Sequence, residues 1–295
     1  MTEFVRTPDE RFANLPGYDF APRWFGWEGL RLHYLDESEG PPVVLFHGEP
    51  TWAFLYRKMI PVLTAAGFRA IAPDYPGFGR SDKPTDPDFY TYDRMTASMA
   101  ALVEDLDLRD ATAVVQDWGG PIGLRVATEA PERFSRLSIL NTGLFTGGGR
   151  PNEAFARWRS FAERNPDLPV GRVVTSAAAT TWGDDVVAAY EAPFPDQTHK
   201  VGAWRFPGIV PLAEDDPGAA EMRAVAEALG RWEKPAQVLF GDSDPIFSVR
   251  AGARMADLIP GAGDLEVVEG AGHFLQEDKG EEVAERIVGF LARSG

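Results

Sequence analysis

Apolar runs alternate with segments of helical periodicity over most of the chain. Short, β-branched apolar runs predict buried strands at 42–46, 69–72, 112–115, 137–141, 236–240 and 265–268. Apolar residues at helical spacing predict helices over 54–66, 92–106, 121–129, 219–229, 249–258 and 281–292. Residues 23–37 alternate in part and predict a hairpin. Because strands and helices alternate, we expect an α/β fold with a mostly parallel sheet covered by helices on both faces.

This alternation is interrupted in the second half of the chain. After Asn141 the sequence is mainly helical or irregular and rich in Trp, Phe and Pro, and the alternation resumes near Ala219. We therefore expect one α/β core, made of residues 1–141 and 218–295, with a helical cap inserted as residues 142–217.

The segment Val114–Gly120 combines a strand end, a sharp turn and a helix start. This pattern predicts a nucleophile elbow, which exposes one side chain above a parallel sheet, and the exposed residue would be Asp117. An aspartate side chain has a pKa of about 3.9 in short peptides, so it is already an anion at neutral pH and can attack a carbon directly. The local sequence alone fits a helix N-cap at Asp117 equally well.

Two later strand ends supply partners for Asp117. Ligands bind at the carboxyl ends of such strands, where Asp242 and Asp244 follow one predicted strand and His273 follows the next. The chain order of nucleophile, acid and histidine is that of the α/β hydrolases. We prefer Asp244 as the acid, because Pro245 stiffens its loop, and assign Asp242 to the turn. Asp244 would then orient the His273 imidazole.

The loop after the strand 42–46 lies at the same edge of the sheet. We expect the backbone N–H groups of Glu49 and Trp118 to form an oxyanion hole. His47 in this loop fits a structural role better than that of a second base.

Composition excludes several classes of function. The formal net charge of −16 over 295 residues argues against nucleic acid and anionic membranes as partners. The absence of cysteine excludes disulfides, thiol nucleophiles and cysteine metal sites. The first ten residues do not resemble a secretory signal and no apolar run is long enough to span a membrane, so we expect a cytoplasmic protein.

Four motifs together resemble the haloalkane dehalogenases of the α/β-hydrolase superfamily, in the subfamily with His-Gly-Glu-Pro. They are the segments Phe46–Pro50, Asp74–Pro84, Val115–Gly120 and Gly272–Glu277. The resemblance covers nearly the whole chain. It implies that Asp117 displaces a halide from a small haloalkane and forms an alkyl ester, which water activated by His273 then hydrolyses. It also implies that the reaction needs no cofactor or metal, and we expect a monomer.

A departing halide needs hydrogen-bond donors in an apolar pocket, and an indole N–H provides one without an acceptor. Trp118, next to the nucleophile, is the first candidate. An ionised Glu49 would have no side-chain proton to offer, so the second donor must come from the cap. Similarity to the family favours Trp158 over Trp182 and Trp204.

Other functions remain open at this point. Epoxide hydrolases share the aspartate nucleophile but commonly use two cap tyrosines, whereas this cap holds only Tyr190. Fluoroacetate dehalogenases usually carry Arg at the position of Trp118, so Trp favours neutral substrates. A catalytically silent binding module of the same fold is disfavoured because every member of the catalytic set is present.

Overall fold

The central sheet has the predicted α/β organisation. A computed structural model describes residues 2–149 and 151–294, and among these residues eight strands form one sheet in the order β10-β9-β8-β7-β4-β5-β3-β2. Its parallel strands are β4 (Pro42–Phe46), β5 (Arg69–Pro73), β7 (Ala111–Gln116), β8 (Phe134–Leu140), β9 (Ala236–Gly241) and β10 (Glu266–Val268). The predicted hairpin forms the antiparallel edge, as β2 (Arg23–Trp27) and β3 (Leu30–Glu37). Two short strands, β1 (Phe4–Val5) and β6 (Lys83–Pro84), pair separately.

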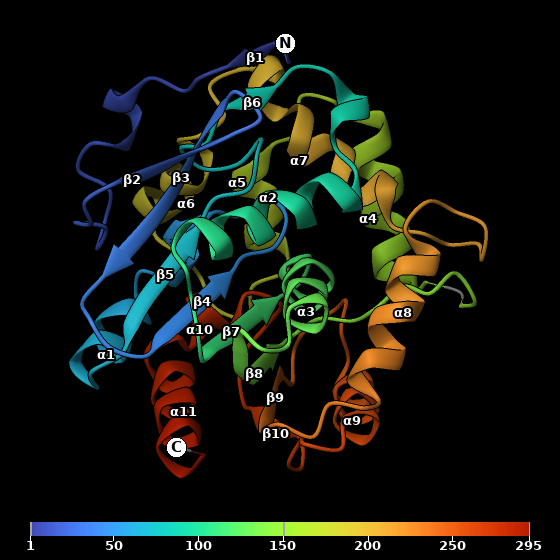
Figure 1. The fold of residues 1–295 in the computed structure, drawn as a ribbon. Coiled ribbons are helices and arrows are strands. Elements are labelled where there is room, and N and C mark those ends of the chain that lie inside the picture. The colour runs from blue at the N-terminus through green and yellow to red at the C-terminus, as the bar shows by residue number, and fades with distance from the viewer. Residues whose placement is uncertain (1, 150, 295) are drawn as a thin grey trace.

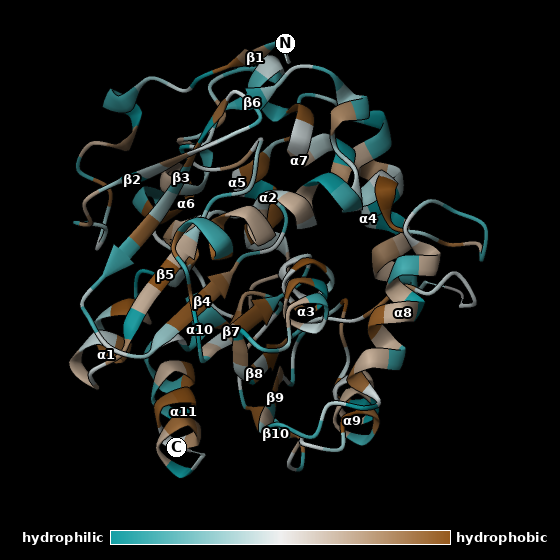
Figure 2. Cartoon of the chain, viewed as in Figure 1, coloured by the Kyte–Doolittle hydropathy of each residue, from teal (hydrophilic) through white to brown (hydrophobic). Residues whose placement is uncertain are grey.

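Helices cover both faces of the sheet. In Figure 1, α1 (Ile60–Ala65) and α11 (Gly280–Arg293) lie at the lower left of the view, and α3 (Gly119–Glu129), α8 (Ala219–Leu229) and α9 (Val249–Leu258) lie to the right of the strands β7 to β10. Helix α2 (Tyr92–Asp105) packs on α3, and the short α10 (Leu275–Asp278) leads into α11. The strands between these layers are strongly hydrophobic (Figure 2), as expected for a sheet buried on both faces.

One predicted helix is wrong in its extent. Instead of a single helix over 54–66, the chain forms a 3₁₀ turn, η2 (Ala53–Tyr56), followed by α1, which begins at Ile60. Pro61 lies in the first turn of α1, where a proline is tolerated because its missing N–H has no partner there. An unbroken helix through this position would lose a backbone hydrogen bond.

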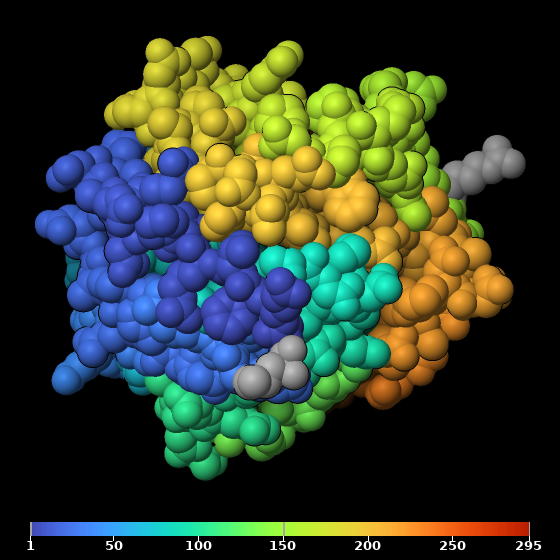
Figure 3. All heavy atoms as spheres, turned by 90° about the horizontal axis from the view of Figure 1, so that it is seen from above, coloured from blue at the N-terminus to red at the C-terminus, as the bar shows by residue number. Residues whose placement is uncertain are grey.

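Between β8 and α8, the described residues form helices joined by loops, with no strand among them. It forms α4 (Glu153–Arg164), α5 (Val170–Ser176), α6 (Asp184–Glu191), η4 (Gln197–Lys200), α7 (Val201–Arg205) and η5 (Phe206–Ile209). In Figure 1 these helices occupy the upper half of the view. The N-terminal segment, which includes η1 (Asp9–Phe12), lies against these helices (Figure 3). Two side-chain hydrogen bonds hold it there: Thr7 donates to the carbonyl of Pro193, and Arg11 donates to the carbonyl of Ala192.

No helix in the described part of the chain is both long enough and apolar enough to cross a membrane.

A last short element, the 3₁₀ turn η3 (Pro87–Phe89), precedes α2. The parallel strands β4, β7, β9 and β10 all end at one edge of the sheet, which places the loops after them next to one another.

Candidate active site

Asp117 lies at a strained turn between β7 and α3. Its φ is +49°, in the left-handed region, which costs a non-glycine residue about 1–3 kcal/mol. Two glycines, Gly119 in the turn and Gly48 in the loop after β4, allow the turn and the loop to approach each other closely. A Cβ on Gly119 would lie 2.0 Å from the carbonyl oxygen of Phe46, and a Cβ on Gly48 would lie 2.3 Å from the Cβ of Asp117. The backbone therefore presents Asp117 as an elbow presents its nucleophile.

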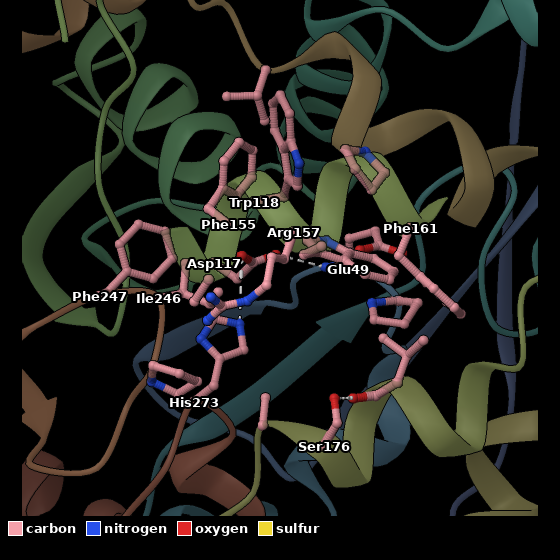
Figure 4. A pocket seen from close by; sticks show the side chains of 18 of the residues that line it. Glu49, Asp117, Trp118, Phe155, Arg157, Phe161, Ser176, Ile246, Phe247 and His273 are labelled. Carbon is pink, nitrogen blue, oxygen red and sulfur yellow. Dashed lines mark hydrogen bonds and ion pairs between the residues drawn. The ribbon is translucent and has the colours of Figure 1, made fainter. Parts of the chain in front are cut away.

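The two carboxylate oxygens of Asp117 have different surroundings. The Glu49 backbone N–H donates to Oδ1 at 2.8 Å, whereas Oδ2 lies 3.5 Å from His273 Nε2 (Figure 4). The N-cap interpretation is wrong, because Trp118 occupies the N-cap position of α3 and the Asp117 side chain bonds to the Glu49 loop instead. Within the described residues, the Trp118 N–H makes no hydrogen bond to this carboxylate.

The structure brings His273 and Asp244 together and leaves Asp242 apart. His273 Nδ1 lies 3.0 Å from Asp244 Oδ2, and the side chain of Asp244 is fully buried. The other Asp244 oxygen accepts hydrogen bonds from the backbone N–H groups of Ile246 and Phe247, at 2.7 and 3.0 Å. The exposed Asp242 accepts instead from a loop amide at 3.0 Å.

The pKa of His273 reflects two nearby carboxylates. Burial lowers the pKa of the imidazole, but the charges of Asp244 and Asp117 and their hydrogen bonds outweigh burial and raise the pKa to about 10. These two carboxylates therefore favour the protonated imidazole of His273 at neutral pH.

Side chains that the sequence analysis did not single out hold the His273 loop. Asn141 Nδ2 donates to the carbonyls of Gly272 and His273, at 2.8 and 3.1 Å, and Gln116 Nε2 donates to the His273 carbonyl at 3.2 Å. Asp278 accepts from the Gly272 N–H at 2.8 Å. Gln116 is the last residue of β7, and Asn141 follows the last residue of β8. Their position at the carboxyl edge of the sheet is the feature of the sequence that could have identified them as site residues.

A cavity of about 540 Å³ opens over Asp117 (Figure 4). Its inner end is lined by Glu49, Asp117, Trp118 and His273, and its walls are mainly apolar and include Phe155 of α4. The space is therefore enclosed between the ends of the central strands and the helices α4 and α5.

The candidate halide donors differ in their access to the cavity. Trp118 and Trp158 both line the cavity, whereas Trp182 and Trp204 do not. The Trp182 indole N–H is directed at Asp278 Oδ1, 3.4 Å away. Within the part of the chain that is described, no hydrogen bond engages the indole nitrogen of Trp118 or Trp158.

The surroundings of Glu49 act against the ionised form that the sequence analysis assumed. Glu49 is only 6% exposed, and its Oε1 has no hydrogen-bond partner among the described residues. Burial, and then the charge of Asp117, raise the pKa of Glu49 well above its usual value. The site therefore favours the neutral carboxyl group over the carboxylate more than water does.

Tyr190, the cap tyrosine considered for epoxide activation, is directed elsewhere. It is fully buried, and its hydroxyl donates to Glu277 Oε2 at 2.9 Å. Glu277 is also paired with Arg57, and none of these three side chains lines the cavity. The structure therefore offers no support for epoxide activation by Tyr190.

His47 is buried behind the oxyanion loop. Its Nδ1 donates to the Gly48 carbonyl at 2.9 Å, and its Nε2 accepts from the Tyr75 N–H at 3.3 Å. Burial lowers the pKa of His47, so the ring is neutral and both nitrogens are occupied by the backbone. Among residues 2–149 and 151–294, no three His, Asp or Glu side chains are grouped closely enough to hold a metal ion.

The fold and this site define an α/β hydrolase in which a carboxylate occupies the nucleophile position. A family model described as alpha/beta hydrolase fold matches residues 41–280. A haloalkane dehalogenase of Psychrobacter cryohalolentis is 47% identical over 98% of both chains, and one of Mycobacterium marinum is 49% identical over 97% of this chain and 99% of its own. The tetrameric structure of the haloalkane dehalogenase DpaA from Paraglaciecola agarilytica has a TM-score of 0.91, with 37% identity over 96% of this chain and 97% of DpaA. The chain belongs to the haloalkane dehalogenase family of the α/β hydrolases, which confirms the predicted fold class and family.

Proposed function

We propose that the protein hydrolyses the carbon–halogen bond of small haloalkanes, giving an alcohol and a halide through an alkyl ester on Asp117. The observation that carries this proposal is the asymmetric environment of the Asp117 carboxylate. Oδ1 is held by the Glu49 N–H, while Oδ2 faces the cavity side of the elbow near His273.

In the first half-reaction, Asp117 Oδ2 attacks the halogen-bearing carbon, the carbon–oxygen bond forms, and the halide leaves with the bonding electrons. The indole N–H groups of Trp118 and Trp158 would stabilise the halide, because both side chains line the cavity and neither donates elsewhere among the described residues. The mainly apolar wall strengthens these hydrogen bonds by excluding water. The raised pKa of Glu49 disfavours a second negative charge beside the departing anion.

In the second half-reaction, the neutral imidazole of His273 takes a proton from water while the water oxygen bonds to the ester carbonyl carbon. Asp244 would orient the imidazole and stabilise the imidazolium that forms. The negative charge then develops on Asp117 Oδ1, where the Glu49 N–H already donates at 2.8 Å. We assign the second oxyanion donor to the Trp118 N–H, which follows the nucleophile in the chain. The tetrahedral intermediate then collapses: its bond to the alkyl-bearing oxygen breaks, that oxygen takes the imidazolium proton and leaves as the alcohol, and Asp117 is restored as a carboxylate that holds one oxygen from water.

The electrostatics of the pair favour this order of events. Before alkylation, the Asp117 anion is one of the charges that raise the pKa of His273. The ester is neutral, so its formation removes that contribution and lowers the pKa of the imidazole. Ester formation therefore shifts His273 toward the neutral imidazole that the hydrolysis step requires.

The organisation around this site is also part of the proposal. We assign residues 1–141 and 218–295 to the hydrolase core and 142–217 to the cap that closes the cavity. A monomer suffices, since one chain supplies every group named above, although the tetrameric DpaA makes the solution mass worth measuring. A cytoplasmic location fits the acidic composition.

Halide release provides the direct test. The protein should release halide and acidify a weakly buffered solution with 1,2-dibromoethane or 1-bromobutane, and should form no diol from styrene oxide. Asp117→Ala is the matched inactive control. Diol formation without halide release would support epoxide hydrolysis instead.

A further inference from the structure

The outer end of the cavity differs chemically from its inner end. Phe155 and Trp118 in the interior are only 7% and 6% exposed. At the outer end, Phe161 is 38% exposed and the side chain of Arg157 is 73% exposed. Arg172 also lines the cavity and is exposed, so this end is the mouth.

The two mouth arginines come from neighbouring helices that face the same space. On α4, Ala154, Arg157, Trp158 and Phe161 line the cavity at helical spacing, so Arg157 belongs to the face turned toward it. On α5, Arg172 and Ser176 line it one turn apart. Figure 4 labels Arg157 and Phe161 among the side chains that line this cavity.

Few carboxylates of the protein pair with the mouth arginines, so their guanidinium groups can bind an anion from solution. The ion pair of Arg157 is with Glu153 at 3.3 Å, a carboxylate that is 92% exposed. Arg172 forms no ion pair with any described residue. The acidic side chains that line the cavity, Glu49 and Asp117, both lie at its inner end. The rest of the protein is strongly acidic, so these guanidinium groups form a local positive region on a chain of net charge −16.

The interior limits where a substrate can carry a charge. A carboxylate next to the halogen-bearing carbon would lie beside the Asp117 anion, and Trp118 offers no cation to hold it. The mainly apolar walls would also oppose a charged group along the chain. A charge at the far end of an alkyl chain avoids both costs, because it stays at the hydrated mouth.

On the basis of the proposed dehalogenase function, we propose that Arg157 and Arg172 bind the carboxylate of ω-haloalkanoates, whose halogenated end reaches Asp117. A guanidinium group can bind a carboxylate through two hydrogen bonds, and charged groups at a rim mainly affect association and its salt dependence. The reaction itself is unchanged: the carbon–halogen bond is replaced by a bond to Asp117, and water then frees an ω-hydroxyalkanoate.

The test compares three substrates of equal chain length: 6-bromohexanoate, 6-bromohexanol and 1-bromohexane. The quantity measured is the ratio of kcat/KM for the bromohexanoate to kcat/KM for the bromohexanol. In Arg157→Gln/Arg172→Gln this ratio should fall about three- to tenfold, mainly through KM, which is the range expected for two exposed ion pairs. Added sodium sulfate should lower the ratio for the unmodified protein and have little effect on the double variant.

Arg254→Gln on α9 is the matched control, because Arg254 is exposed and does not line the cavity. It should leave the ratio unchanged. The proposal is overturned if the double variant keeps the ratio of the unmodified protein, if the salt dependence of the two is equal, or if the unmodified protein converts bromohexanol but not bromohexanoate. Turnover of 1-bromohexane reports separately on the proposed function, and its absence would refute that function rather than the role of the arginines.

Discussion

Replacing His273 with Phe should separate the two half-reactions. The imidazole is stacked on Phe247, with ring centroids 5.8 Å apart, and lies edge-on to Phe274 at 4.7 Å. A phenyl ring fits this aromatic setting and leaves Asp117, Glu49 and the cavity wall in place. Because ester formation needs no base, the variant should alkylate and then stop.

The expected magnitudes follow from the number of sites and from the lost contacts. Each chain carries one Asp117, so halide release should end near one equivalent per chain. Loss of a general base should slow hydrolysis by about 10²–10⁴-fold. The substitution also leaves the buried Asp244 carboxylate without the Nδ1 contact, and an unpaired buried charge should lower the free energy of unfolding by about 3–5 kcal/mol. Adding Asp244→Asn removes the unpaired charge and provides a second, more stable version of the experiment.

Two readouts settle the outcome. Rapid-quench halide measurement with excess 1-bromobutane gives the burst amplitude, and intact mass spectrometry should show one added butyl group per chain. Continued release of many equivalents would refute the role of His273 as the base. If the variant is folded by circular dichroism but shows no burst at all, the claim that Asp117 forms the ester without help from His273 would be refuted.

The remaining predictions use matched pairs of side chains. Asp244→Asn should slow ester hydrolysis by about 10²–10⁴-fold, whereas Asp242→Asn should leave steady-state turnover unchanged; equal effects would contradict the assignment of the acid. Trp158→Phe should weaken inhibition by bromide about tenfold or more, the value of a hydrogen bond to a charged group, whereas Trp182→Phe should not. Glu49→Gln keeps the backbone N–H and removes a carboxyl group with a raised pKa. Above the unfolded-state pKa of about 4.3, the unfolded wild type loses this proton at a lower pH than the folded protein does, so the advantage of the Gln variant in thermal stability should grow with pH; a constant difference from pH 4 to 8 would contradict the raised pKa of Glu49.

Most of the fold could be predicted because its elements carry strong local signals. The helices at 219–229 and 249–258 coincide with α8 and α9, since each combines helical spacing with clear boundaries. The prediction of one helix over 54–66 was wrong because Pro61 cannot donate a backbone hydrogen bond and so favours the first turn of a helix, whatever the hydrophobic pattern before it. The short pair of β1 and β6 has no local signal, because its partners are distant in sequence.

The site residues that follow strand ends could be predicted from the sequence. Properties that depend on tertiary packing could not. Asp117 and His273 follow buried strands at one edge of the sheet, which the sequence indicates. The raised pKa of Glu49 depends on burial by residues from other parts of the chain. The choice between Trp158 and Trp182 depends on how the cap packs: Trp158 lies on α4 and lines the cavity, whereas Trp182 lies in the loop before α6 and does not line it, and the sequence pattern gives neither placement.

The most direct test of the covalent ester is a single turnover in ¹⁸O-labelled water with enzyme in excess over 1-bromobutane. We expect the butanol to carry unlabelled oxygen from Asp117 and one ¹⁸O atom to appear in the peptide containing Asp117. Labelled butanol from the first turnover, with an unlabelled Asp117 peptide, would mean that water attacks the haloalkane directly and would contradict the covalent mechanism.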